Sequence, residues 1–123
     1  MNDIQRNLSV NKSRLWNMHL EMAKIGPGVA GGNNRQALTD DDRKGRDLFR
    51  KWCEAADMTV STDTMGNMFA RRSGRDQTLS PVLAGSHLDT QPTGGRFDGV
   101  FGVLAALETV QTMNDLGLSL IHI

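Results

Sequence analysis

The sequence predicts an α/β fold in which the last strand and the last helix are central. Three observations predict it: two segments with helical spacing of apolar residues, a pair of alternating segments, and a short apolar run followed by an apolar helix. The length of 123 residues suits one domain with a single core. We expect residues 1–10 to be a lead-in, residues 11–117 to form the folded part and residues 118–123 to be a tail.

The first predicted helix covers residues 11–25, in which apolar side chains recur at helical spacing at Leu15, Met18, Met22 and Ile25. Gly26-Pro27-Gly28 ends this helix, because glycine permits a left-handed cap and proline cannot continue a helix. Residues 28–38 contain Gly31-Gly32-Asn33-Asn34 and have no periodicity, so they predict a surface loop.

The second predicted helix covers residues 39–57. Thr39 can cap its free N–H groups, and three acids, Asp40 to Asp42, lie at the positive end of its dipole. We expect it to bury Leu48, Phe49, Trp52, Cys53 and Ala56. Alternation at 58–62 and 67–71, on either side of a turn at 64–67, predicts a hairpin.

The apolar run 81–86 is typical of a strand buried on both faces. A polar loop at 73–80 precedes it and a loop at 89–98 follows it. The last predicted helix covers 99–117 and is strongly apolar, with Val100, Val103, Leu104, Leu107 and Val110. Ligands of open α/β sheets bind at the carboxyl ends of strands, so the connection between this strand and this helix is the candidate site.

Three residues of this connection suit a metal centre. His87 and Asp89 are two positions apart, so on an extended chain they point to the same side, as a ligand histidine and the carboxylate that orients it would. Asp98 lies at the mouth of the last helix, and one carboxylate can bridge two cations. Structural roles stay open from spacing alone: a hydrogen-bonded histidine, a turn at Asp89-Thr90, and Asp98 as a helix N-cap.

The run Gly85-Ser86-His87-Leu88-Asp89-Thr90-Gln91-Pro92-Thr93-Gly94-Gly95-Arg96-Phe97-Asp98-Gly99 resembles the signature of one enzyme family. This family comprises N-carbamoyl-L-amino-acid hydrolases, β-ureidopropionases and allantoate amidohydrolases, in the carboxypeptidase/aminoacylase superfamily. Further similarity at 15–26, 35–39, 42–52, 65–67 and 99–108 extends the resemblance over about residues 10–117.

The resemblance implies the N-terminal part of a two-metal aminopeptidase-like catalytic domain, with helices packed on a central mixed sheet, and incomplete in this chain. It implies that His87 is a terminal metal ligand, Asp89 the catalytic carboxylate that orients it, and Asp98 the bridging ligand. Two divalent ions are expected, Zn²⁺ first and otherwise Mn²⁺, Co²⁺ or Ni²⁺. A hydroxide between them would attack the carbamoyl (ureido) carbon of an N-carbamoyl amino acid.

The resemblance also implies a homodimer of the full-length protein, through a lid domain inserted in the catalytic domain. Family members are several times longer, and their paired glutamates, further histidine ligands and substrate-binding arginine lie beyond the part that this chain matches. We therefore expect the chain alone to be inactive. His19 is expected at the surface rather than in the site, and His122 has no matching position. Residues 118–123 depart from the family; they read as the start of a next strand or, in our sharper hypothesis, as translated adaptor DNA.

Composition narrows the function class. Lys plus Arg and Asp plus Glu number 14 each, so no basic surface for nucleic acid or an anionic membrane is expected. No apolar run reaches transmembrane length, and a single cysteine, Cys53, suits a reducing compartment, so we expect a cytoplasmic protein. The glycines fit no nucleotide-binding motif. Two alternatives remain: an allantoate amidohydrolase or related metallopeptidase, and an inactive short binding or dimerising protein.

Overall fold

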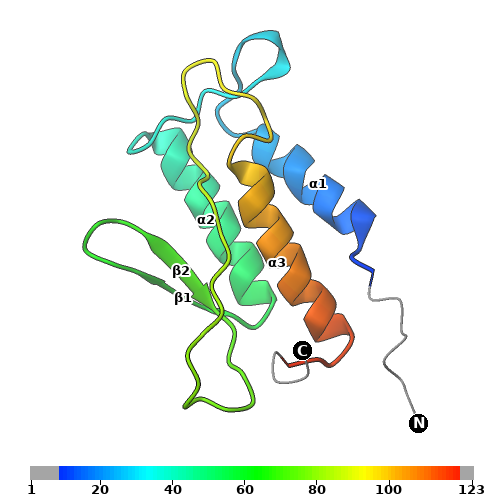
Figure 1. Ribbon diagram of the computed structural model, residues 1–123. Coiled ribbons are helices and arrows are strands. Elements are labelled where there is room, and N and C mark those ends of the chain that lie inside the picture. Colours follow the sequence, from blue (N-terminus) through cyan, green and yellow to red (C-terminus); the bar gives the residue numbers. More distant parts are fainter. Residues whose placement is uncertain (1–8, 120–123) are drawn as a thin grey trace.

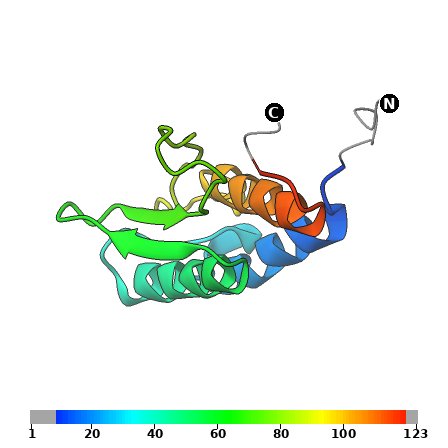
Figure 2. The same cartoon turned by 90° about the horizontal axis from the view of Figure 1, so that it is seen from below.

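The computed structural model describes residues 9–119, which form three α-helices, a short 3₁₀ turn at Val29–Gly31 and one two-stranded sheet. Helices α1 and α3 pack side by side, and the hairpin lies on one face of α2 (Figures 1 and 2). The predicted lead-in and tail lie mostly outside the described residues. None of the described helices has the length and apolar character needed to span a membrane.

Helix α1 covers Lys12–Ala23 and α2 covers Asp40–Ala55, close to the predicted bounds. Asn11 caps α1 by accepting a hydrogen bond from the Arg14 N–H at 3.0 Å. Thr39 caps α2 as predicted, accepting from the Asp42 N–H at 3.2 Å, and Gly26 has the positive φ of +65° expected after α1. Side-chain chemistry at the helix ends therefore sets where both helices begin.

The hairpin pairs β1 (Thr59–Thr62) with β2 (Met68–Arg71) in antiparallel register, with Thr59 opposite Arg71. Gly66 in the connecting turn has φ +88°. The described residues contain this one sheet, and the hairpin predicted from the alternating segments is confirmed.

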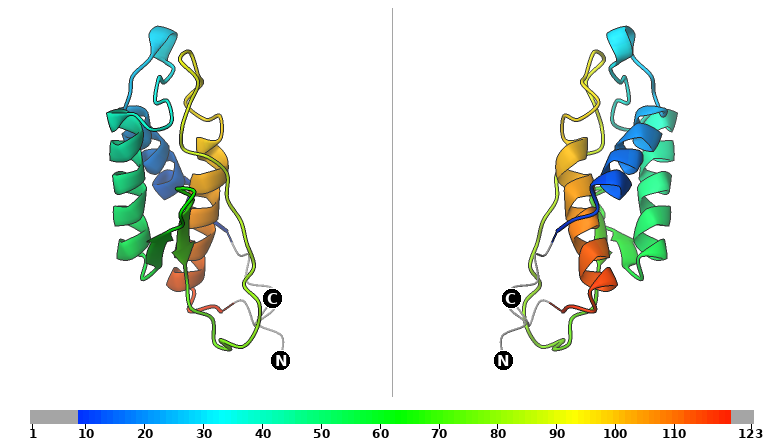
Figure 3. Two further views of the ribbon diagram at one scale, coloured as in Figure 1. Left: turned by 90° about the vertical axis from the view of Figure 1, so that its left-hand side faces the viewer. Right: turned by 90° about the vertical axis from the view of Figure 1, so that its right-hand side faces the viewer.

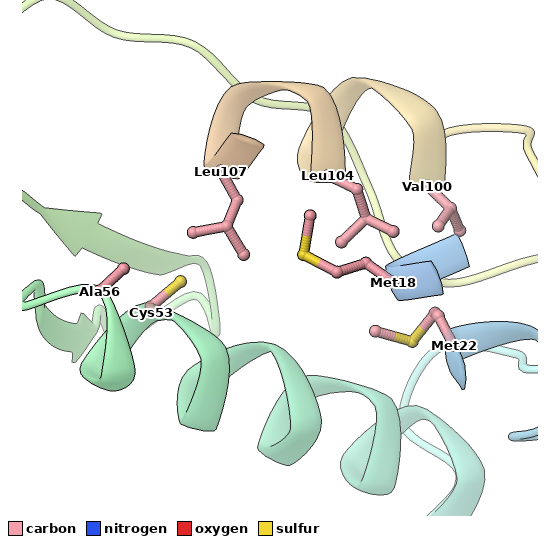
Figure 4. Close-up of a cluster of buried hydrophobic side chains, with 7 residues drawn as sticks. All are labelled: Met18, Met22, Cys53, Ala56, Val100, Leu104 and Leu107. Atoms are coloured by element: carbon pink, nitrogen blue, oxygen red, sulfur yellow. The ribbon is translucent and has the colours of Figure 1, made fainter. Parts of the chain in front are cut away.

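Helix α3 covers Val100–Asp115 and supplies one side of the core. Buried apolar side chains from all three helices meet in one cluster, drawn in Figure 4: Met18, Met22, Cys53, Ala56, Val100, Leu104 and Leu107. The Glu108 carboxylate, fully buried, joins α3 to α1 by accepting from the Arg14 guanidinium at 2.7 and 2.9 Å. Burial alone would raise the pKa of Glu108, but hydrogen bonds from Arg14, Asn11 and Thr112 outweigh burial and hold that pKa below its ordinary value.

The predicted buried strand at 81–86 is wrong as an element of this structure. The segment is extended and runs along α3 (Figure 3), yet its residues are exposed and make no backbone–backbone hydrogen bond with any residue from 9 to 119. A strand is defined by pairing with a neighbour, and none of the described residues lies beside it in that way. The apolar run therefore has strand composition without a strand's partners.

Candidate active site

The candidate site lies where the extended segment turns into α3. Its loop, residues 87–98, reaches the same end of the molecule as the loop that follows α1 (Figures 1 and 3). Two isolated bridges join this region, one between Pro27 and Asn33 and one between Asn33 and Gly94. The loop that carries the predicted ligands is thus supported by a second loop rather than extending freely into solvent.

His87 and Asp89 lie together, as their spacing suggested. The His87 Nδ1 is 2.9 Å from the Asp89 carbonyl oxygen and 3.5 Å from the Asp89 carboxylate Oδ1. The side chains are about half exposed, 50% for His87 and 44% for Asp89. With Nδ1 engaged in this way, the neutral tautomer that donates from Nδ1 leaves the Nε2 lone pair for an electrophile.

The His87 ring lies directly over Gly99, at the start of α3. A Cβ at residue 99 would fall 2.2 Å from the ring Cε1, and the Gly99 φ is +70°, so a side chain is excluded both by space and by backbone conformation. Asp98 immediately precedes this glycine. His87 therefore packs on the backbone at the start of α3, and Asp98 is one residue away from that contact along the chain.

Asp98 does not serve as the N-cap of α3. Gly99 takes the N-cap position with no side-chain capping bond, and the Asp98 backbone carbonyl accepts from the Val100 N–H at 2.8 Å. Within residues 9–119, the exposed Asp98 carboxylate makes no hydrogen bond or ion pair. Asp98 is therefore not the helix cap that remained open as an alternative, and its carboxylate oxygens can accept from or bind another partner.

The segment 28–38 is mostly exposed, as predicted for a surface loop, but it also supplies two buried polar residues that support the site. Asn33 and Arg35 are fully buried. The Asn33 side-chain amide donates to the Ala23 and Gly26 carbonyls at the end of α1, while its backbone exchanges hydrogen bonds with Gly94 at 2.9 and 3.0 Å. Hydropathy could not reveal these residues, because both are polar; the resemblance over 35–39 was the one sequence signal that included Arg35.

Arg35 bonds to the ligand loop from behind. Its Nε donates to the Leu88 carbonyl at 3.0 Å, and its backbone N–H donates to the Thr90 hydroxyl at 2.7 Å. Thr90 is also buried. The turn of this loop lies further on, at Pro92-Thr93, where the Gly94 N–H donates to the Gln91 carbonyl at 3.1 Å, so the predicted turn at Asp89-Thr90 is wrong.

The prediction that His19 lies at the surface is wrong. The side chain is buried at 4% exposure, stacked on Phe101 with centroids 5.9 Å apart and edge-on to Phe97 at 5.2 Å. Both ring nitrogens are buried, and neither has a hydrogen-bond partner in the described part of the chain. Burial lowers the pKa of His19, so the ring is neutral at pH 7. The aromatic surroundings of His19 come from Phe97 and Phe101, which flank Asp98 and Gly99 in the sequence. The hydropathy of the first helix could not indicate them, because they lie far from His19 along the chain.

The donors that lie here fit a divalent cation in kind but not in number. Imidazole nitrogen and carboxylate oxygen are ligands of Zn²⁺ and similar ions, and the start of α3 offers one of each: the His87 ring, which packs on Gly99, and the carboxylate of Asp98, directly before that glycine. Among the described residues, no group of three or more His, Cys, Asp or Glu side chains is arranged to hold a metal ion. The residues fit part of a metal site whose other ligands would have to come from elsewhere.

Comparisons with known proteins agree with the resemblance. An N-carbamoyl-L-amino-acid amidohydrolase of Rhizobium meliloti is 62% identical over 116 residues, and one of Geobacillus stearothermophilus is 38% identical over 113. A solved hydantoinase/carbamoylase family amidase of Burkholderia ambifaria matches 91% of the chain at 61% identity with a TM-score of 0.89. No family model matches.

These matches confirm the fold class. At that level of structural agreement, the three helices and the hairpin are arranged as in the solved amidase. The chain spans about 28% of the length of the Rhizobium meliloti and Geobacillus stearothermophilus relatives, in agreement with the expected incomplete domain.

Proposed function

We propose that this chain, which belongs to the N-carbamoyl-L-amino-acid amidohydrolase family, supplies part of a two-metal centre that cleaves the carbamoyl C–N bond of N-carbamoyl amino acids. One observation carries the proposal: the His87–Asp89 pair lies against Gly99, where only glycine fits, and the unengaged carboxylate of Asp98 belongs to the residue directly before that glycine. An ordinary strand-to-helix corner needs none of these three features.

Each of the three residues has a distinct task. His87 would bind one ion through Nε2, while Asp89, on the Nδ1 side, would fix the ring and raise its basicity. Asp98 would bridge two ions through its two carboxylate oxygens. Bound divalent ions, with Zn²⁺ as our first choice and Mn²⁺, Co²⁺ or Ni²⁺ as others, lower the pKa of coordinated water from about 15.7 to about 7 and polarise a carbonyl.

We infer the substrate class from the sequence identity to relatives whose names give their substrates. The relatives named N-carbamoyl-L-amino-acid amidohydrolase reach 62% identity, whereas a ureidoglycolate hydrolase of Arabidopsis thaliana and an allantoate deiminase of Glycine max reach 31% and 35%. The compounds in these names, N-carbamoyl amino acids, ureidoglycolate and allantoate, share a ureido group, which the same centre would attack. We propose an N-carbamoyl-L-amino acid as substrate, with an allantoate-type ureido acid as the second candidate, and a homodimer as the form of the full-length protein.

A chimera tests the activity directly. Residues 1–117 would be joined to the part of the Rhizobium meliloti relative that lies beyond its matched region, and hydrolysis of N-carbamoyl-L-amino acids and of allantoate would be measured. We expect the chimera to prefer the carbamoyl substrate and the 123-residue chain alone to be inactive. His87→Ala and Asp98→Ala should abolish hydrolysis, and Asp89→Asn should lower it about 10–100-fold, because it removes an orienting group rather than a ligand.

The matched control is Asp47→Asn, which removes a carboxylate from the exposed face of α2 and should leave activity unchanged. An active chimera that tolerates His87→Ala and Asp98→Ala would refute the assignment of the site. A folded but inactive chimera would favour the alternative of a short binding or dimerising protein.

A further inference from the structure

We propose that Arg35 is a positioning residue that fixes the backbone on both sides of Asp89, at Leu88 through its guanidinium and at Thr90 through its main chain, so that the affinity of the His87 site for a metal depends on a residue that does not touch the metal. This inference rests on the proposed function and extends it to the residues that support the loop from behind.

The first step is the set of bonds to the loop. The Arg35 Nε donates to the Leu88 carbonyl at 3.0 Å. On the other side of Asp89, the Thr90 N–H donates to the Arg35 carbonyl at 2.7 Å, and the Thr90 hydroxyl accepts from the Arg35 N–H at 2.7 Å. One residue therefore holds the chain both before and after Asp89.

The second step is direction. Leu88 packs against the core cluster and Thr90 is buried, and because side chains alternate along an extended backbone, residues 87 and 89 are presented to the opposite side. That side is where the His87 ring meets Gly99 and where its Nδ1 lies 3.5 Å from the Asp89 carboxylate. Loss of the bonds to Leu88 and Thr90 would release the alternation that keeps the two side chains together.

The third step is the anchor at the other end of the guanidinium. Its Nη1 donates to the Ile25 carbonyl at 2.7 Å and to the Met22 carbonyl at 3.1 Å. The Met22 carbonyl also accepts from the Ile25 N–H at 3.1 Å, whereas the Ile25 carbonyl lies beyond the end of α1. A cation at this end of the helix also interacts favourably with the helix dipole. The loop is thus tied, through one rigid planar group, to the C-terminal end of α1.

The fourth step is the room made for this side chain. Arg35 is fully buried, and the helix α2 approaches it with a glycine: a Cβ at Gly45 would lie 2.9 Å from the Arg35 Cδ. Burial lowers the pKa of the guanidinium, while the nearby carboxylates of Asp42, Asp41 and Asp89 raise it. Arg35 is therefore a buried cation for which Gly45 of the neighbouring helix leaves space, and Asp89 is one of the carboxylates near it. These features indicate that Arg35 supports the loop rather than merely filling space in the core.

The test uses the chimera that carries residues 1–117, its Arg35→Met variant, and two readouts: Zn²⁺ affinity by isothermal titration, and amide hydrogen exchange of residues 86–99 by mass spectrometry. We expect Arg35→Met to weaken Zn²⁺ binding about 10–100-fold, the range for removing a group that orients a ligand, and to speed exchange over 86–99. Thr90→Val removes the hydroxyl, which accepts from the Arg35 N–H and donates to the Gln91 carbonyl at 3.0 Å, so it should shift both readouts in the same direction while disturbing the fold less.

Arg72→Met is the matched control, because Arg72 also donates to a backbone carbonyl, that of Leu118, but at the far end of α3. It should lower stability without changing Zn²⁺ affinity or exchange at 86–99. The inference is overturned if Arg35→Met and Thr90→Val leave both readouts as they are in Arg72→Met. Equal Zn²⁺ binding by the wild type and His87→Ala would instead refute the metal site of the proposed function, and exchange alone would then decide whether Arg35 orders the loop.

Discussion

Single polar residues in the interior of this protein differ in how well their hydrogen-bonding groups are satisfied. The Asn33 amide nitrogen has several carbonyl partners, and Glu108 accepts from three groups, whereas His19 has none for either ring nitrogen. A buried polar atom without a partner costs about 1–3 kcal/mol. His19 is therefore the residue at which the described fold carries the clearest local cost.

We predict that His19→Leu stabilises the protein by on the order of 1 kcal/mol, because it removes two unsatisfied nitrogens from an apolar environment. It should also flatten the dependence of stability on pH. Because burial lowers the pKa of His19 in the folded state, the unfolded chain binds the proton first as the pH falls below about 6.5, so the wild type loses stability between pH 7.5 and 5.5.

Chemical denaturation at pH 7.5 and 5.5 measures both effects. His87→Leu serves as the comparison, because that ring is half exposed. If the wild type and His19→Leu lose the same stability on acidification, burial of the neutral ring is not what makes the fold sensitive to acid.

At the level of elements, the bounds of the helices and the hairpin could be predicted because local chemistry sets them. Thr39, Gly26 and the turn at 64–67 act within a few residues of sequence. The strand at 81–86 could not be settled in this way. Its apolar composition is local, but a strand also needs backbone partners, and these are a property of other parts of the fold.

The cap of α2 gives a prediction at this scale. Thr39→Ala should destabilise the protein by about 1 kcal/mol, because the Asp42 N–H loses its acceptor at the start of the helix. Thr109→Ala is the matched control: Thr109 is exposed in the interior of α3 and donates only to the Ala105 carbonyl of its own helix. Alanine favours helix there, so that variant should be neutral or slightly stabilising.

Urea denaturation of the two variants, at the same pH, measures the difference. Equal midpoints for Thr39→Ala and the wild type would mean that the bond at 3.2 Å adds nothing to the start of α2.

For the molecule as a whole, the fold class and the pairing of His87 with Asp89 could be predicted from the sequence, while the support of the loop that carries them could not. Glycine spacing and the His87–Asp89 interval are visible along the chain. The link from Arg35 to Leu88 joins residues 53 positions apart and depends on α1, α2 and the ligand loop packing together. No periodicity marks a polar residue whose partners are backbone carbonyls of two other segments.

The exposed extended segment also determines how the isolated chain should behave. Leu79, Val82 and Leu83 are 60%, 74% and 80% exposed, beside backbone groups of 81–86 that lack backbone partners among residues 9–119. Such an edge pairs readily with a second chain.

We predict concentration-dependent association in sedimentation velocity, and we expect Leu83→Lys to suppress it by placing a charge on that edge. Leu38→Lys, at a residue 97% exposed on a different loop, adds the same charge and should leave association unchanged. If both variants suppress association equally, net charge rather than the open edge is its cause, and a chain that stays monomeric at every concentration would show that the segment is protected in solution.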